Sequence, residues 1–483
     1  AAVTLADGAD ITIAAGKAKS HTFNGDNDST GTAGQVLVTI SNTTEDLNAD
    51  LTTITVQQDA TVGSVTVTED LEFTGTLLTG IDTTLLNGVD LTIAAGKALN
   101  NTFNGVNGDT APTVSVTLTD VAADKSADLN LIQVGEDAAL VSVTVNESLI
   151  FAGTLHASLA TTVADSFTLT TTAAIANGKT INHDGSENGQ GLIITAATSA
   201  DFALEGNIDT TIADLGVNLD AISYTGDLVV STVSVDGKTI QTGTGSSDIT
   251  LGAVAATNIT GNTGIDKVTF DNTTSYTGTY NLLAGNNVIN LVDGSNIGGA
   301  TVDAVGGAIN FTLVDGASVT MNNATHALLV AGDLTAAGTD TITIADVATI
   351  TTEASVENYT VAEGATVDIG TAAGHLTQVI TETGAVGTVS TFTLGDGAYT
   401  GDWVGIDTTD IVKIDVGGSD ISGNAGLDAG VTIDFQNQAA GSVTLNENQI
   451  AAAGLSYTNT TNAQTVNITA AADFETTNTI EAY

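Results

Sequence analysis

The chain has 483 residues, 56 acidic residues against eight basic ones, and a formal net charge of −48. All eight basic residues are lysines, and there is no cysteine. A chain this acidic repels nucleic-acid phosphates and anionic membrane surfaces, and without cysteine it has no disulfides, zinc–thiolate sites or iron–sulfur clusters. We therefore expect no nucleic-acid partner and, because no stretch is apolar enough for a spanning helix, no membrane insertion.

The composition predicts a folded protein made mainly of β-strands. Apolar residues make up 42% of the chain and the mean hydropathy is +0.24, whereas acidic disordered chains are poor in such residues. Valine, isoleucine and threonine are abundant, and these β-branched residues favour strands over helices. We therefore expect an all-β fold.

The first feature along the chain is an internal repeat of about 80 residues. Gly8–Asn27 reads GADITIAAGKAKSHTFNGDN, and Gly88–Asn107 reads GVDLTIAAGKALNNTFNGVN. The two copies also end alike, at Gly63–Leu77 and Val141–Leu155. A repeat of this length indicates one structural unit that is used several times.

A third copy of the repeat is degenerate. Its dipeptide Gly178-Lys179 aligns with Gly16-Lys17, which places His183 at the position of His21. The sequence thus predicts three β repeat units, at residues 1–79, 80–157 and 158–245, followed by a region of different texture at 246–483.

Within the repeats, aliphatic residues alternate with threonine or serine. Examples are Val36–Ile40, Ser64–Thr68 and Ser115–Thr119. This period of two predicts strands with a buried aliphatic face and an outer hydroxyl face. Two short segments, Thr44–Asp50 and Val121–Asp128, are each expected to form one helical turn.

The region 246–483 is expected to be a β-solenoid. Its strand–turn segments Ile289–Gly294 and Ile309–Gly316 end in Asp-Gly pairs that lie 22 residues apart, which suits one coil of a parallel solenoid. Aromatic residues are only 4% of the chain, whereas a β-sandwich usually joins its two sheets with large aromatic side chains. We therefore predict β-solenoid-like stacking of repetitive β modules, with tandem β-sandwich domains as the alternative.

The sequence shows no recognisable catalytic pattern, so we predict that the chain is not an enzyme. The five histidines are scattered without metal-ligand spacing, and no nucleophile elbow or phosphate-binding loop is present. Because there is no arginine, no bidentate clamp for phosphate or carboxylate substrates exists.

One acidic turn near the N-terminus resembles the start of a calcium loop. The segment DNDSTG at residues 26–31 places Asp26, Asp28 and Thr30 at alternate positions before Gly31. Short oxygen ligands in this arrangement suit a calcium ion, although the twelfth position is Leu37 and not the usual glutamate. The alternative is a solvated acidic turn.

Further acidic turns lie in the second half of the chain. Gly261–Thr269, which contains Asp266, resembles the glycine-rich calcium-binding nonapeptide of RTX proteins, and Gly423–Val431, with Asp428, is a weaker match. Divalent cations at such turns would relieve the repulsion among the excess negative charges, so calcium is the predicted cofactor; the alternative is that acidity serves solubility alone. The remaining candidate ligands are Asp271, Asp293 and Asp315.

The full profile resembles bacterial S-layer and related surface-array proteins of the calcium-binding, type I-secreted kind. The likeness rests on the Thr/Ala/Gly/Asp/Asn/Val composition, the absence of cysteine, the few basic residues and turns such as Asn258–Asp266. It implies an extracellular, cell-surface protein whose main partner is itself, in a lattice or filament stabilised by calcium. A cell-surface glycan or an outer-membrane anchor is a further expected partner.

The function expected from this resemblance is that of a structural subunit in a self-assembling surface layer or filament. The alternative is the shaft and head of a secreted repetitive adhesin, for which Tyr399 and Trp403 form the only aromatic cluster suited to ligand contact. Sequons such as Asn42-Thr43-Thr44 also permit an archaeal, glycosylated surface protein.

Overall fold

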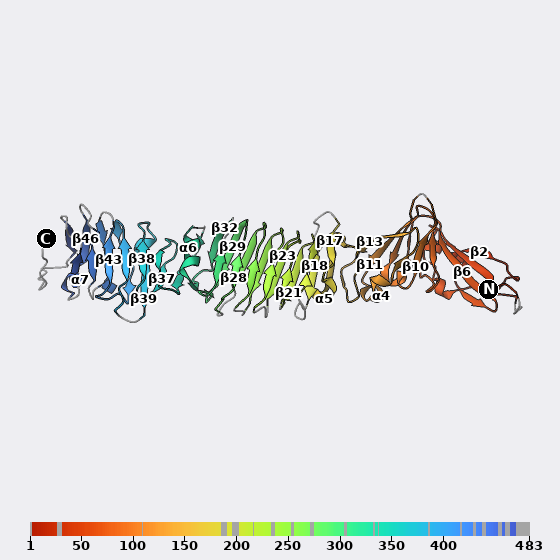
Figure 1. Ribbon diagram of the computed structural model, residues 1–483, viewed down its shortest axis with the longest axis horizontal. Coiled ribbons are helices and arrows are strands. Elements are labelled where there is room, and N and C mark those ends of the chain that lie inside the picture. The colour runs from red at the N-terminus through yellow and green to blue at the C-terminus, as the bar shows by residue number, and fades with distance from the viewer. Residues whose placement is uncertain are drawn as a thin grey trace. The chain divides into compact units, whose positions relative to one another are not determined.

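The computed structural model shows a mostly β protein, a parallel-sheet β-solenoid of about 19 turns with little helix (Figure 1). The described strand pairs are all parallel, as stacked coils require. The predictions of an all-β fold and of solenoid stacking are confirmed, and the sandwich alternative is wrong. The structure describes residues 2–26, 31–108, 110–184, 191–195, 202–215, 217–232, 237–252, 256–270, 275–303, 307–331, 334–336, 338–384, 387–415, 418–427, 431–436, 441–452, 456–458 and 464–469.

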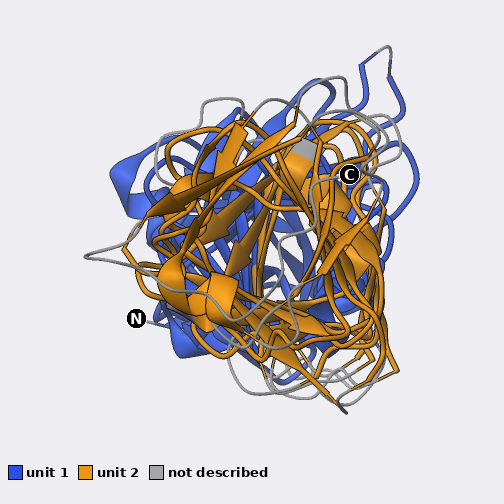
Figure 2. Cartoon of the chain, turned by 90° about the vertical axis from the view of Figure 1, so that its left-hand side faces the viewer, with its two compact units in different colours: residues 1–214, 219–229 blue, residues 215–218, 230–483 orange. Residues whose placement is uncertain are grey.

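The chain divides into two compact units, coloured separately in Figure 2. Unit 1 contains residues 1–214 and 219–229, and unit 2 contains residues 215–218 and 230–483. Strand β23 (Leu228–Thr232) contains the boundary between positions 229 and 230.

Unit 1 is built from parallel sheets that we name S1 to S4 in chain order, with β19 and β22 forming a further pair. S1 contains β1 (Ala2–Thr4), β3 (Thr22–Asn24) and β5 (Thr55–Gln57). S2 contains β2 (Ile11–Ala14), β4 (Gly34–Ile40), β6 (Ala60–Val67), β8 (Thr83–Leu85), β10 (Thr102–Gly105) and β12 (Gln133–Val134). S3 contains β7 (Leu71–Phe73), β9 (Asp90–Ala94), β11 (Thr113–Leu118), β13 (Ala139–Val145), β15 (Thr161–Val163), β17 (Thr180–His183) and β20 (Glu205–Gly206). Strands β14 (Leu149–Ile150), β16 (Thr168–Thr172), β18 (Gly191–Thr195) and β21 (Thr210–Leu215) belong to S4, and β19 (Phe202–Ala203) pairs with β22 (Leu219–Asp220).

The sequence repeat does not contain a whole number of coils. Stacking carries Ile13 to Val38, then to Val65 and then to Thr83, all in S2. The sequence equivalent of Ile13 is Ile93, which lies beyond Thr83 and belongs to S3. Each repeat therefore spans three full coils and one further side of the next coil. Strands of neighbouring repeats pair with each other across residues 79/80 and 157/158.

Short helical turns mark the corners of unit 1. Both predicted turns are present, as α2 (Thr44–Leu47) and α4 (Ala122–Lys125). The other corner elements are α1 (Ala15–Ala18), α3 (Ala95–Ala98), α5 (Ala173–Ala176), and the 3-10 turns η1 (Leu51–Thr53) and η2 (Leu129–Leu131).

The structure corrects the alignment of the third repeat. Ser20, Asn100 and Gly178 follow α1, α3 and α5, and all three have a left-handed φ, of 62°, 59° and 64°. Gly178 is thus the equivalent of Ser20, and Lys179, not His183, occupies the position of His21. The alignment based on the Gly-Lys dipeptide was wrong because α5 has Ala174 and Ile175 where α1 has Gly16 and Lys17.

Unit 2 continues the same architecture. One parallel run contains β24 (Thr239–Gln241), β26 (Asn258–Thr260), β28 (Thr279–Asn281) and β31 (Thr301–Asp303), and the next contains β25 (Ser247–Leu251), β27 (Asp266–Phe270), β29 (Asn286–Leu291), β32 (Ala308–Leu313) and β34 (Leu334–Thr335). A third run contains β30 (Asn296–Ile297), β33 (Ser318–Met321), β35 (Thr341–Ile344), β37 (Asn358–Ala362), β39 (Val379–Thr383) and β42 (Trp403–Val404). A fourth contains β36 (Thr349–Thr351), β38 (Thr366–Ile369), β40 (Thr391–Leu394), β43 (Ile411–Ile414), β45 (Thr432–Asp434) and β47 (Ser456–Thr458). The last contains β41 (Gly397–Ala398), β44 (Gly418–Asp420), β46 (Ser442–Asn446) and β48 (Thr465–Thr469).

The Asp-Gly spacing of unit 2 reports the coil length, as predicted. Leu291 pairs with Leu313, 22 positions on, so the two Asp-Gly turns follow equivalent strand ends. The helical elements are α6 (Asn323–Ala331), α7 (Glu447–Ala451), η3 (His375–Thr377) and η4 (Ala425–Leu427). Among the described residues, no helix is long and apolar enough to cross a membrane.

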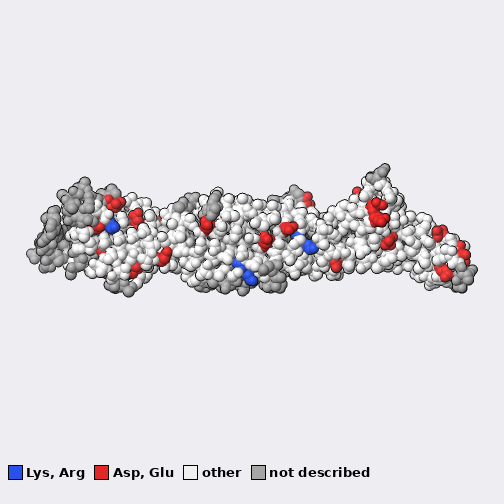
Figure 3. Space-filling view, in the orientation of Figure 1, with Lys and Arg blue, Asp and Glu red and all other residues white. Residues whose placement is uncertain are grey.

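The core consists of inward-facing aliphatic residues in stacked columns. In β4, buried Val36, Val38 and Ile40 alternate with more exposed residues. Most aromatic residues of the described ranges lie inside as well: Phe23 and Phe103, equivalent in repeats one and two, are both fully buried. The acidic residues on the visible face lie scattered among neutral ones in both units and do not form one patch (Figure 3).

Candidate functional site

The predicted N-terminal calcium loop is described only in part. Asp26 is exposed and follows the buried Gly25, whereas Asp28 and Thr30 lie outside the described residues. On the far side of the loop, the Thr32 amide donates to Oδ1 of Asp7 at 2.6 Å.

Asp266, predicted as a calcium ligand in an RTX-like turn, lies inside the coil. Its side chain is fully buried, and Oδ1 accepts hydrogen bonds from the hydroxyls of Ser247 and, at 3.1 Å, Thr242. Oδ2 is buried without a hydrogen-bond partner, and burial raises the pKa of this carboxyl. Through its Oδ1, this carboxyl links its own strand to the preceding coil.

Asp293 and Asp315 lie in exposed turns of neighbouring coils, two residues after the ends of β29 and β32. Oδ1 of Asp293 accepts the Ser318 amide at 3.0 Å, one coil further on. The other two predicted ligands, Asp271 and Asp428, lie outside the described residues. Within the described ranges, no three His, Asp or Glu side chains come together in a group that could hold a metal ion.

Two buried aspartates that sequence reasoning did not identify hold the corners of the first two repeats. Oδ1 of Asp46 accepts the amide of Gly16 at 2.7 Å, and Oδ2 accepts the hydroxyl of Ser41 at 2.6 Å. In repeat two, Asp124 accepts the Gly96 amide at 2.6 Å and the Thr119 hydroxyl at 2.6 Å. Both copies of the repeat have a Ser or Thr five residues before the buried Asp. This shared spacing is the sequence pattern that could have identified the two aspartates.

A carboxyl pair lies inside unit 2. Glu382 is 6% exposed and accepts a hydrogen bond from the Ser390 hydroxyl, while Oδ1 of Asp410 accepts the Ser390 amide at 2.9 Å. Burial raises the pKa of both carboxyls, and their proximity adds to the shift of Glu382. Ser390 thus joins the two carboxyls, which come from adjacent coils.

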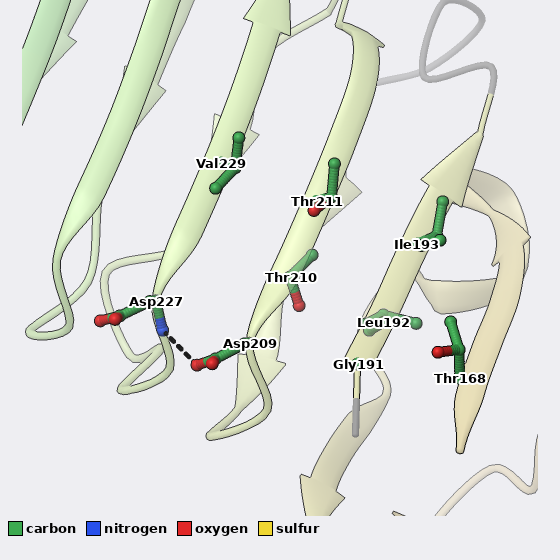
Figure 4. A pocket seen from close by; sticks show the side chains of 9 residues that line it. All are labelled: Thr168, Gly191, Leu192, Ile193, Asp209, Thr210, Thr211, Asp227 and Val229. Atoms are coloured by element: carbon green, nitrogen blue, oxygen red, sulfur yellow. Dashed lines mark hydrogen bonds between the residues drawn. The ribbon is translucent and has the colours of Figure 1, made fainter. Parts of the chain in front are cut away.

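A shallow pocket of about 420 Å³ lies on S4 and the adjoining strand β23 (Figure 4). Asp209 and Asp227 stand at the starts of neighbouring strands, and the Asp227 amide donates to Oδ1 of Asp209 at 3.2 Å. Two exposed carboxylates and flanking threonines offer oxygen acceptors to a cation or a hydroxylated molecule. The pocket is lined by Thr168, Gly191, Leu192, Ile193, Asp209, Thr210, Thr211, Asp227 and Val229.

The aromatic cluster considered for an adhesin is part of the core. Trp403 and Tyr399 are each 1% exposed, and the Trp403 ring packs against Phe392 with ring centroids 5.5 Å apart. These rings do not form a surface platform for a ligand.

The strands at the ends of the sheets present the clearest candidate contact surfaces. β1 and β2 each form one edge of S1 and S2, and β47 and β48 are edge strands in unit 2. Their inward-facing residues are only partly covered, as Ile11 and Ile13 of β2 and Val466 of β48 are half-buried and Ile468 is 43% exposed.

Comparison with known proteins identifies no relative: no protein-family model, curated protein or solved structure matches this chain. The fold and the surfaces described above are therefore the basis for a functional proposal.

Proposed function

We propose that this protein is a structural subunit of a self-assembling extracellular surface layer or filament, stabilised by calcium at Asp-rich turns. The observation that carries the proposal is the uncovered edge of the solenoid. Among the described strands, β1 pairs only with β3 and β2 only with β4, and the other side of each leaves backbone groups and aliphatic side chains partly open.

Open edges of this kind favour association. Solenoid proteins that stay monomeric need terminal repeats with a polar outer face, and soluble β proteins protect exposed edge strands with charges, bulges or a covering element. Here the inward-facing positions of the edge strand β2 are isoleucines. Covering them with another chain would bury apolar surface and pair the free backbone groups.

Calcium is proposed because acidic residues gather in turns while basic residues are few. Asp293 and Asp315 occupy matching exposed turns of adjacent coils and would contribute two carboxylates to one ion. A calcium ion takes about six to eight oxygen ligands, so backbone carbonyls, water or a second chain would complete the shell.

A calcium titration tests this proposal. Sedimentation velocity and electron microscopy of the purified chain should show assemblies that grow as calcium rises from zero to about millimolar, the range of extracellular calcium modules. Magnesium at equal ionic strength is the control, since it separates ion-specific binding from screening. A chain that stays monomeric with an unchanged melting temperature throughout would refute the proposal.

A repetitive adhesin is less well supported. The aromatic pair that suggested ligand contact, Tyr399 and Trp403, is buried in the core. A glycan-array screen that gave specific binding would favour the adhesin over the structural subunit.

A further inference from the structure

The first coil carries a strand whose inward side chains lack their normal cover. Ile11 and Ile13 of β2 pair with Val36 and Val38 of β4, which are fully buried. Both isoleucines belong to the same columns as these valines, yet both are half-buried. The difference arises because no described strand pairs with the other side of β2.

The second repeat shows how such a strand is covered. Leu91 and Ile93 of β9 are the sequence equivalents of Ile11 and Ile13, and they are 1% and 0% exposed. Strand β7 covers them, with Leu71 beside Leu91 and Phe73 beside Ile93. One additional parallel strand with apolar residues at positions i and i+2 is therefore what buries this motif.

The strand β48 offers a matching edge. Among the described strands it pairs only with β46, so that Val466 lies beside Val443 and Ile468 beside Leu445. Val443 and Leu445 are 0% and 1% exposed, whereas Ile468 is 43% exposed. Within the described residues, the outer coil at this edge is thus exposed in the same way as the first coil.

We propose that β48 of one copy pairs in parallel with β2 of a second copy, forming a head-to-tail contact. This inference rests on the proposed function and names the interface through which the subunits would join. Val466 would lie beside Ile11, Asn467 beside Thr12 and Ile468 beside Ile13, so the aliphatic columns of the two copies become continuous. Such a contact is heterologous and builds a linear polymer.

The direction of the strands and the charge at the first coil both favour head-to-tail over head-to-head pairing. The described strand pairs of this solenoid are parallel, which only a head-to-tail contact continues. Asp7 and Asp10 are exposed beside the first coil, so two such ends would bring four carboxylates together. Strand β48 carries only Thr, Val, Asn and Ile, and it adds no negative charge to the contact.

Cysteine cross-linking tests the contact, because the native chain has no cysteine of its own. Thr12→Cys and Asn467→Cys variants are mixed under assembling conditions and treated with a short bismaleimide. We expect cross-linked dimers in the mixture and none from Thr12→Cys alone. Thr92→Cys is the matched control: it occupies the equivalent position in repeat two, where β7 covers the strand, and should give no dimer with Asn467→Cys.

A charge substitution on the same strand provides an independent test. Ile13→Glu places a carboxylate in the contact and should weaken association by at least about tenfold, because a desolvated unpaired charge costs more than about 1.4 kcal/mol. Thr12→Glu, on the outward side of β2, should leave association close to that of the native chain. Circular dichroism of both variants confirms that each remains folded.

The possible results distinguish a failure of the proposed contact from a failure of the proposed function. Thr12→Cys chains that cross-link to each other would overturn the head-to-tail contact. An assembly that forms without any Thr12–Asn467 product would overturn the contact while leaving the proposed function standing. A chain that sediments as a monomer under all conditions would overturn both.

Discussion

Replacing Asp46 with alanine is predicted to loosen the corner between α1 and α2. The Asp46 side chain is 2% exposed, and it accepts the Gly16 amide at 2.7 Å, the Ser41 hydroxyl at 2.6 Å and the Ser41 amide at 3.2 Å. Alanine leaves both amides without this acceptor. Each stranded donor costs about 1–3 kcal/mol, and water reaches the half-buried Gly16 and Ser41 in part, so we expect a loss of about 2–4 kcal/mol.

Hydrogen exchange is the suitable assay, because solenoid stability is a sum of local and nearest-neighbour contributions and a single melting curve averages over coils. Amides of α1 and β4 in Asp46→Ala should exchange faster, while those of unit 2 keep their native rates. Asp124→Ala should produce the same effect one repeat further on.

The matched control is Glu45→Ala, which removes an equal charge from the same helical turn. Glu45 forms an exposed ion pair with Lys17 at 2.6 Å, and solvent-exposed pairs contribute little to stability. If Asp46→Ala and Glu45→Ala gave equal exchange rates, the buried carboxylate would not be the acceptor that stabilises this corner.

Three further outcomes are expected. Gly16→Ala should destabilise the chain by about 1–3 kcal/mol in chemical denaturation, because its Cβ would lie 2.6 Å from Glu45 Cβ; Gly191→Ala, whose Cβ would meet no atom closer than 3.9 Å, is the tolerated control. Burial raises the pKa of Glu382 to about 7 from an ordinary value of 4.5, so its stabilising contribution is complete below about pH 4.5 and is lost as pH rises through 7. Glu382→Gln should therefore raise the melting temperature at about pH 8 and leave it unchanged at about pH 5, and an equal change at both would contradict the assignment. His326, whose pKa burial lowers to about 4, should show a neutral imidazole by NMR at about pH 6, and a protonated ring there would contradict its placement in the core.

The strands of this fold are readable from the sequence because burial in a solenoid repeats with period two along each strand. The alternation of Val36–Ile40 and the spacing of Asp293 and Asp315 depend only on which face of a strand points inward and on the coil length. Both are local properties, and local pattern was enough to predict them.

The placement of the acidic residues could not be predicted in the same way. Asp46 is buried and Asp50, four residues later, is exposed, although both belong to the same short turn region. Ser41, which donates to Asp46, is local, but the Gly16 amide that binds Oδ1 comes from the preceding coil, and no local pattern shows that contact. Asp266 is a further case: its turn matches a calcium motif locally, yet the hydroxyls of Ser247 and Thr242 one coil back bring it inside.

The length of the sequence repeat is not a whole number of coils, and this determines which side of unit 1 each repeat presents to solvent. Since each repeat adds one face beyond three coils, the equivalent strands β2, β9 and β16 belong to S2, S3 and S4 in turn. The repeats therefore place equivalent strands on successive sides of unit 1, in the manner of a screw thread. For the proposed assembly, this means that a neighbour recognising one strip would find the next one facing another direction, so contacts would be distributed around the circumference of unit 1 and not along one side.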